Sequence, residues 1–230
     1  MNLRYWADVT LAEATGRERR RDPVLPGTGG PAGNALLTAW TGLLLLGLFL
    51  VELVTLLNLR ALLSWHVVVG VLLVPPALLK TASTGWRIAS YYAKRAPYRR
   101  AGPPPMPLRL LGPLVVLFTL VLLGSGLVLV ALGPAASRAG FLTVLGRRVD
   151  AVTVHQAAFV AWGAVTGLHT AGRLVPALRI VAAPWRAATR VPGRRFRGAV
   201  VVVTLLVAAI AAAAVLGVSH PWLAGGLHRR

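Results

Sequence analysis

The sequence contains no cysteine and few acidic residues: six Asp and Glu stand against 25 Lys and Arg in 230 residues. Without thiols the chain cannot form disulfides, thiolate metal sites or iron–sulfur clusters, and it cannot attach haem c through cysteine. Charged residues of both signs make up only 13%, whereas a soluble domain has about 25%. This scarcity of charge favours a protein that lies in lipid.

The patterns of hydrolytic enzymes are also missing from the sequence. It has no recognisable nucleophile triad, phosphate-binding loop or paired carboxylates, so we expect no hydrolytic chemistry. The net charge of +19 would suggest nucleic-acid binding in a soluble protein. Here the basic residues lie between apolar runs, so they are better explained by orientation in a membrane, and no nucleic-acid partner is expected.

Five apolar segments are long enough to cross a bilayer, for which about 20 residues are needed. They cover residues 35–58, 62–83, 110–132, 151–172 and 199–218. The first two are joined by a very short connection, which predicts a tight antiparallel hairpin, and Pro75 and Pro76 predict a kink in the second. The sequence therefore predicts an all-α integral membrane protein with five transmembrane helices, of which the first four form a bundle.

The apolar segments and the residues between them divide the chain into four expected regions. Residues 1–33 are expected to be a mostly disordered tail with a short amphipathic helix near Leu3–Ala14, and residues 34–176 the four-helix membrane domain. Residues 177–198 are expected to be a basic loop, and residues 199–230 the fifth helix with a short tail.

Most Arg and Lys residues fall in the N-terminal tail and in the loops after the second and fourth apolar segments. Because positive residues stay on the cytoplasmic side, the N-terminus is predicted inside and the C-terminus outside a bacterial-type plasma membrane. The second and fourth helices then both run from outside to inside.

These two helices carry ionisable residues at one common spacing. The second contains HVVVGVLLVPPALLK, from His66 to Lys80, and the fourth contains HQAAFVAWGAVTGLH, from His155 to His169. Fourteen residues rise about 21 Å and make almost four turns, so both ends of each stretch point to roughly one face. His66 and His155 are predicted near the outer surface, and Lys80 and His169 nearer the cytoplasm.

Two haems stacked across a bilayer need this arrangement, because each iron takes one axial ligand from each of two facing helices. The pattern predicts His66 and His155 as ligands of an outer haem. It predicts His169 as a ligand of an inner haem, with Lys80 opposite it if burial removes the proton of the amine. The alternatives are a proton or ion relay, or packing alone, and for Lys80 a side chain that reaches the headgroups or a haem propionate.

Other residues near these positions have two interpretations each. Gly70, Gly163 and Gly167 leave room for a porphyrin or for a neighbouring helix. Glu52, the only acid in the five segments, either carries protons to or from a quinone or hydrogen-bonds to another helix. Three arginines at the cytoplasmic rim either hold haem propionates or contact lipid phosphates: Arg87, Arg109 and Arg173.

SWHVVVGVLLVPPALLKTASTGWRIASYY and HQAAFVAWGAVTGLH together resemble bacterial membrane cytochromes b of the cytochrome b561 kind, including the cytochrome b subunits of nickel hydrogenases and formate dehydrogenases. The resemblance covers about residues 36–176. It implies haem b between the helices, with His66, His155 and His169 as axial ligands. Better-known members supply four histidines for two haems, whereas this chain offers three and a lysine.

The combined prediction is a membrane-embedded b-type cytochrome that transfers electrons across the bilayer between a quinone pool and an extracytoplasmic redox partner protein. It would hold at least one haem b, with two expected, and a quinone is a further expected ligand. The alternative is an ion- or proton-coupled transporter that uses the His, Lys and Glu side chains as a relay.

Overall fold

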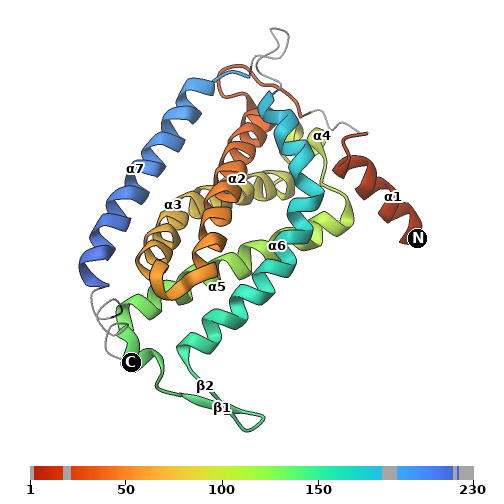
Figure 1. The fold of residues 1–230 in the computed structure, drawn as a ribbon. Coiled ribbons are helices and arrows are strands. Elements are labelled where there is room, and N and C mark those ends of the chain that lie inside the picture. The colour runs from red at the N-terminus through yellow and green to blue at the C-terminus, as the bar shows by residue number, and fades with distance from the viewer. Residues whose placement is uncertain (1–2, 18–21, 183–190, 220–221, 223–230) are drawn as a thin grey trace.

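The computed structural model describes residues 3–17, 22–182, 191–219 and 222, and the described chain is mainly helical (Figure 1). In chain order its elements are α1 (Leu3–Ala14), α2 (Gly30–Thr55), the short 3-10 helix η1 (Leu56–Asn58), α3 (Leu59–Tyr92), α4 (Ala96–Ala101), α5 (Met106–Ser137), β1 (Leu142–Val144), β2 (Arg147–Val149), α6 (Ala151–Ala182) and α7 (Arg194–Val218).

Four helical segments are long and apolar enough to cross a membrane: Gly30–Tyr92, Met106–Ser137, Ala151–Ala182 and Arg194–Gly217. The first comprises α2, η1 and α3. The five apolar stretches found in the sequence lie within these segments, except that the last stretch extends one residue beyond Gly217. Apolar helices of this length indicate a multi-pass membrane protein.

The chain reverses direction between α2 and α3 at Asn58. This residue leaves the helical conformation, and its side chain accepts a hydrogen bond from the amide of Ala61 at 3.3 Å, which caps the start of α3. α3 then continues through Pro75 and Pro76 to Tyr92. The predicted antiparallel hairpin is therefore present, with Thr55 beside His66 at one end and Asn34 beside Ser83 at the other.

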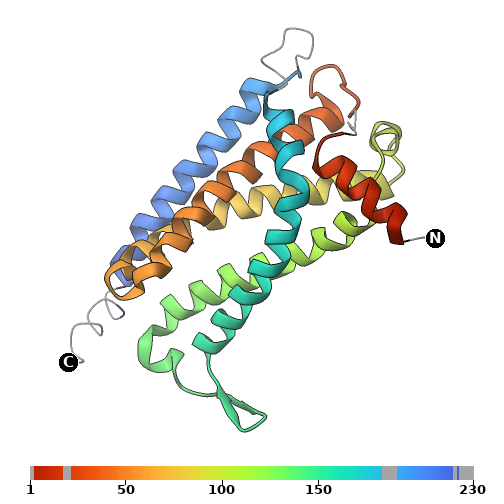
Figure 2. The same cartoon turned by 45° about the vertical axis from the view of Figure 1, so that its right-hand side comes forward.

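The helices α2, α3, α5 and α6 form a ring of contacts: α2 packs on α3, α3 on α5, α5 on α6, and α6 on α2. α7 lies outside this ring and packs mainly on α3 (Figures 1 and 2). Two hydrophobic clusters fill the interior. One joins Leu45, Leu73, Ala77 and Leu123, and the other joins Leu122, Ala158 and Trp162.

Large apolar side chains cover much of the outer surface of the long helices. Ile210 is 71% exposed and Val160 is 70% exposed. An aqueous protein rarely leaves so many of these side chains in contact with water. Lipid is the environment that matches them.

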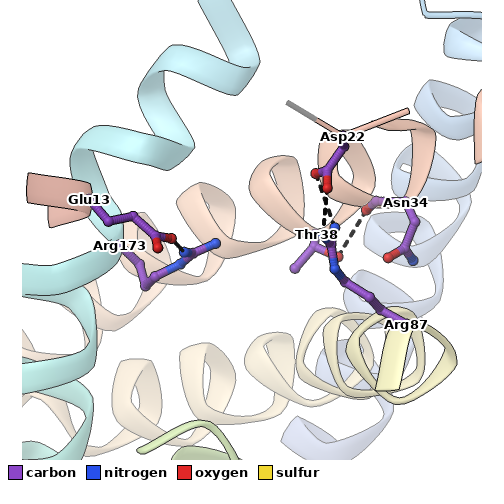
Figure 3. Close-up of polar contacts among 6 residues, drawn as sticks. All are labelled: Glu13, Asp22, Asn34, Thr38, Arg87 and Arg173. Carbon is purple, nitrogen blue, oxygen red and sulfur yellow. Dashed lines mark hydrogen bonds and ion pairs between the residues drawn. The ribbon is translucent and has the colours of Figure 1, made fainter. Parts of the chain in front are cut away.

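The N-terminal segment packs onto the helix ends and contains the expected helix at Leu3–Ala14, where the sequence favoured a mostly disordered tail. Buried Glu13 forms an ion pair with Arg173 of α6. Asp22 binds Arg87 of α3 through two hydrogen bonds of 2.5 and 3.1 Å (Figure 3). These contacts tie residues far apart in the sequence to one end of the helices.

Two connections contain elements that the sequence analysis did not predict. The connection from α3 to α5 contains α4, and the connection from α5 to α6 forms an antiparallel hairpin in which Thr143 pairs with Arg148. α5 is itself interrupted at Gly133, whose φ of 73° is accessible to glycine, just before Pro134. The loop predicted at 177–198 is shorter in the described chain, because α6 continues to Ala182 and α7 begins at Arg194; residues 183–190 and the end of the predicted external tail lie outside the described residues.

Candidate functional site

His66 of α3 and His155 of α6 lie close together, as their matched positions predict. Their ring centroids are 6.4 Å apart and the ring planes stand at 85°. The residues around them come from two further helices, α2 and α5. This cluster, which we call the outer pair, therefore draws on all four helices of the contact ring.

The His66 imidazole is held from α2 through its Nδ1 atom. Glu52 Oε1 lies 2.9 Å from Nδ1, and Thr55 Oγ1 lies 3.0 Å from it. The Thr55 hydroxyl donates its own proton to the carbonyl of Glu52 at 2.5 Å, so towards His66 it acts as an acceptor. Nδ1 therefore carries the proton, and the lone pair of neutral His66 is on Nε2.

The same logic applies to His155. Ser125 Oγ lies 2.9 Å from His155 Nδ1 and donates its proton to the carbonyl of Leu122 at 2.9 Å. Ser125 must then accept from Nδ1, which again leaves the lone pair on Nε2. Next to it, a Cβ on Gly126 would lie 3.2 Å from His155 Cε1, so this glycine makes room for the ring.

Both imidazoles thus match the behaviour of metal ligands, which commonly donate the proton of the second ring nitrogen to a carboxylate, hydroxyl or carbonyl. An imidazole nitrogen lies about 2 Å from the metal it binds, so two trans imidazoles place their ring centres roughly 6 Å apart. The observed centroid separation of 6.4 Å is close to this value.

Among the described residues, no group of three or more His, Cys, Asp and Glu side chains is arranged to chelate a metal ion. Two imidazoles alone suit an iron whose other four positions are filled by a porphyrin. The two imidazoles of the outer pair are the kind of donors that axial ligation of haem would use.

Asp150 fixes the start of α6 just before His155. Its carboxylate accepts hydrogen bonds from the amide and the hydroxyl of Thr153, both at 2.7 Å. These bonds, of which the one from the amide has the larger effect, hold the pKa of Asp150 below its usual value. The cap sets where α6 begins.

Lys80 and His169, the predicted inner residues, do not bond to each other in the described chain. Lys80 Nζ donates to the carbonyl of Thr38 at 3.2 Å, and a Cβ on Gly42 would lie only 2.7 Å from it. Within the described part of the chain, His169 Nδ1 is buried without a hydrogen-bond partner, as is Thr166 Oγ1 one turn earlier. The inner residues are therefore less completely paired than the outer pair, and ligation by Lys80 stays a prediction.

Aromatic side chains lie between the outer pair and the inner residues along α6. Trp162 lies seven residues from both His155 and His169 and is 5% exposed. Its indole donates to Thr119 Oγ1 at 3.1 Å, and its ring lies 4.4 Å from that of Phe49.

The three rim arginines each contact the protein itself. Arg87 binds Asp22, Arg173 binds Glu13, and Arg109 donates to the hydroxyl of Tyr92. Haem propionates bound by these arginines, as predicted, would therefore compete with these protein partners.

Sequence reasoning missed the hydroxyl partners Thr55 and Ser125. One signal was present, since Ser125 stands between Gly124 and Gly126 inside a helix without charged residues for more than twenty positions. A hydroxyl there has few partners besides its own helix carbonyls and a neighbouring polar side chain.

No protein-family model matches the chain, and neither a curated protein nor a solved structure matches it. The fold and the site define a helical membrane protein in which two neighbouring histidines lie between the helices, each hydrogen-bonded to a side chain of another helix.

Proposed function

We propose that this protein is an integral membrane b-type cytochrome that carries electrons across the bilayer, with His66 and His155 as the axial ligands of its outer haem. The single observation that carries the proposal is the outer pair itself: two imidazoles 6.4 Å apart, each held through Nδ1. A bound haem b supplies a one-electron iron couple at this position. Quinone and an extracytoplasmic redox protein are the proposed partners.

Five membrane crossings belong to the proposal. α2 has 26 residues and α3 has 34, and a helix of 20 residues already spans about 30 Å. Because the two run antiparallel, each is counted as one crossing. With the basic segments on the cytoplasmic side, the N-terminus lies inside, the C-terminus outside, and the outer pair towards the outer surface.

The protein residues have separate tasks in this proposal. Nε2 of His66 and His155 bind the iron, while Glu52, Thr55 and Ser125 fix the tautomers and orient the rings. At the inner end His169 is the proposed ligand of a second haem, with Lys80 as its predicted partner. The buried, unpartnered Nδ1 of His169 marks this end as incompletely satisfied by the described protein groups.

The rival function is a proton or ion relay, and the Glu52–His66 pair inside an apolar helix hairpin favours it. Colour separates the two functions. A pyridine haemochrome assay on the purified full-length protein counts haem per chain, and a reduced α-band is expected. A colourless protein would overturn the cytochrome proposal and favour the relay.

Substitution then tests the ligands. His66→Ala and His155→Ala are each expected to remove the outer haem. Gln156→Ala, which changes the exposed neighbour of His155, is the matched control and should keep a full complement. Full haem content in both histidine variants would refute the assignment.

A further inference from the structure

We propose that Glu52 is a positioning residue of the outer haem: its carboxylate holds the His66 imidazole and lowers the reduction potential of the iron. This inference rests on the proposed function and adds to it the residue that sets the electronic character of the site. Glu52 touches His66 and acts on the iron only through that imidazole.

The position of Glu52 is unusual for a carboxylate. It is the only acid in the five long apolar helices, and its side chain is 14% exposed. Oε1 lies 2.9 Å from His66 Nδ1, and Oε2 is buried without a hydrogen-bond partner among the residues that the structure describes. A carboxylate in an apolar span is costly, so such residues are usually retained for a function.

The surrounding helices leave space for this carboxylate. Gly70, one turn beyond His66 on α3, would place a Cβ 3.5 Å from Glu52 Oε1. This is an ordinary van der Waals distance, so Gly70 lies directly beside the carboxylate. The α2–α3 hairpin therefore supplies both the carboxylate, from α2, and the imidazole and glycine beside it, from α3.

The two ligands of the outer pair differ in what accepts their Nδ1 proton. His66 donates to a carboxylate and a hydroxyl, whereas the acceptors beside His155 are neutral groups, the Ser125 hydroxyl and the backbone carbonyl of Leu122. A hydrogen bond to an ionised acceptor is roughly twice as strong as a neutral one, and a carboxylate behind a ligating imidazole raises the basicity of that ligand. A more basic ligand stabilises ferric iron, so the carboxylate lowers the potential.

The test uses full-length protein and two readouts, haem content and a potentiometric titration of the α-band. The component that His66→Ala removes identifies the outer haem. Glu52→Gln keeps the shape and an acceptor oxygen but removes the charge. We expect it to retain haem and to shift the outer redox equilibrium towards ferrous iron by on the order of tenfold, or 59 mV for one electron.

Two further variants sharpen the result. Ser125→Ala, the matched change behind His155, should shift the outer potential less than Glu52→Gln, because it removes a neutral acceptor. Glu52→Asp keeps the charge and should hold haem with a potential closer to the wild type. If Glu52→Gln loses haem, retention of haem by Glu52→Asp still supports the proposal.

Three results contradict the inference in different ways. Full haem content with an unchanged outer potential in Glu52→Gln shows that the carboxylate does not act on the iron. Loss of haem in both Glu52 variants, while the wild type binds it, assigns Glu52 to folding alone. A colourless wild-type protein overturns the proposed function and this inference with it.

Discussion

Trp162 of α6 packs against Phe49 of α2 with their ring centroids 4.4 Å apart, halfway between the two predicted ligand levels. Phe159 stacks on the same indole at 6.2 Å. Along α6, Trp162 therefore lies between the level of His155 and the level of His169. Trp162 is also the largest of the three buried side chains in its hydrophobic cluster.

Replacing Trp162 with Ala should destabilise the protein by about 3 kcal/mol or more, because it leaves a cavity where the indole packed. Trp162→Phe should cost less, since it keeps the ring contact and loses the bond to Thr119. Unfolding in detergent with a chemical denaturant measures both. Trp65→Ala, at a 62% exposed position, is the control; equal losses at both positions would contradict the packing.

Gly126→Val should disturb the outer pair. A Cβ at this position lies 3.2 Å from His155 Cε1, so the imidazole ring must shift to accommodate it. We expect a lower haem content, measured as pyridine haemochrome. Gly124→Val offers a matched control two residues earlier, where nothing lies within 4 Å of the added Cβ. If the two valine variants bind equal haem, the close approach at Gly126 has no consequence.

Lys80→Ala tests the inner site. If the amine ligates iron or contacts a propionate, this change should alter the absorption spectrum or lower the haem count. The chain has one other lysine, exposed Lys94, and Lys94→Ala serves as the control. An unaltered spectrum and count in Lys80→Ala would leave Lys80 as a packing residue bonded to the Thr38 carbonyl.

Glu13→Gln should loosen α1 from α6, because it removes the charge that pairs with Arg173 inside a buried contact. A hydrogen bond to a charged group contributes about 1.5–3 kcal/mol, which bounds the expected loss of docking free energy. Faster limited proteolysis of the N-terminal segment reports the loss. The Asp8→Asn variant, which changes an exposed residue on the same helix, should be cleaved at the wild-type rate. Faster cleavage of this variant as well would point to general loosening of the segment.

Asp150 should make the stability of α6 depend on pH. Its pKa is lowered from 3.8 by the bonds from Thr153, so the stabilisation is fully present above that value and is lost as pH falls through the lower pKa of the folded state. Thermal unfolding measured from neutral to acidic pH follows this change. Asp150→Asn keeps a good N-cap without a titrating group, so it should remove this contribution to the pH dependence. The same acid-dependent loss in Asp150→Asn would assign it to another group.

The outer pair shows how much could be predicted. Fourteen-residue spacing on two co-directional helices placed His66 and His155 at one level, and the structure brings their rings together. The inner level has the same spacing, yet Lys80 bonds to α2 and does not bond to His169 in the described chain. Spacing gives depth and face along one helix, but it does not give the rotation of that helix against its neighbours.

The sequence by itself determined the long apolar helices, the hairpin of α2 and α3 and the equal depth of the two histidines, because hydropathy and the helical repeat are local properties of the chain. Tertiary structure decided which side chains meet those histidines: Glu52 and Thr55 from α2, and Ser125 from α5. It also decided that Glu13 and Asp22 pair with arginines more than sixty residues away along the chain. Such partners depend on how packed helices are rotated and offset, which many weak contacts between distant residues set together.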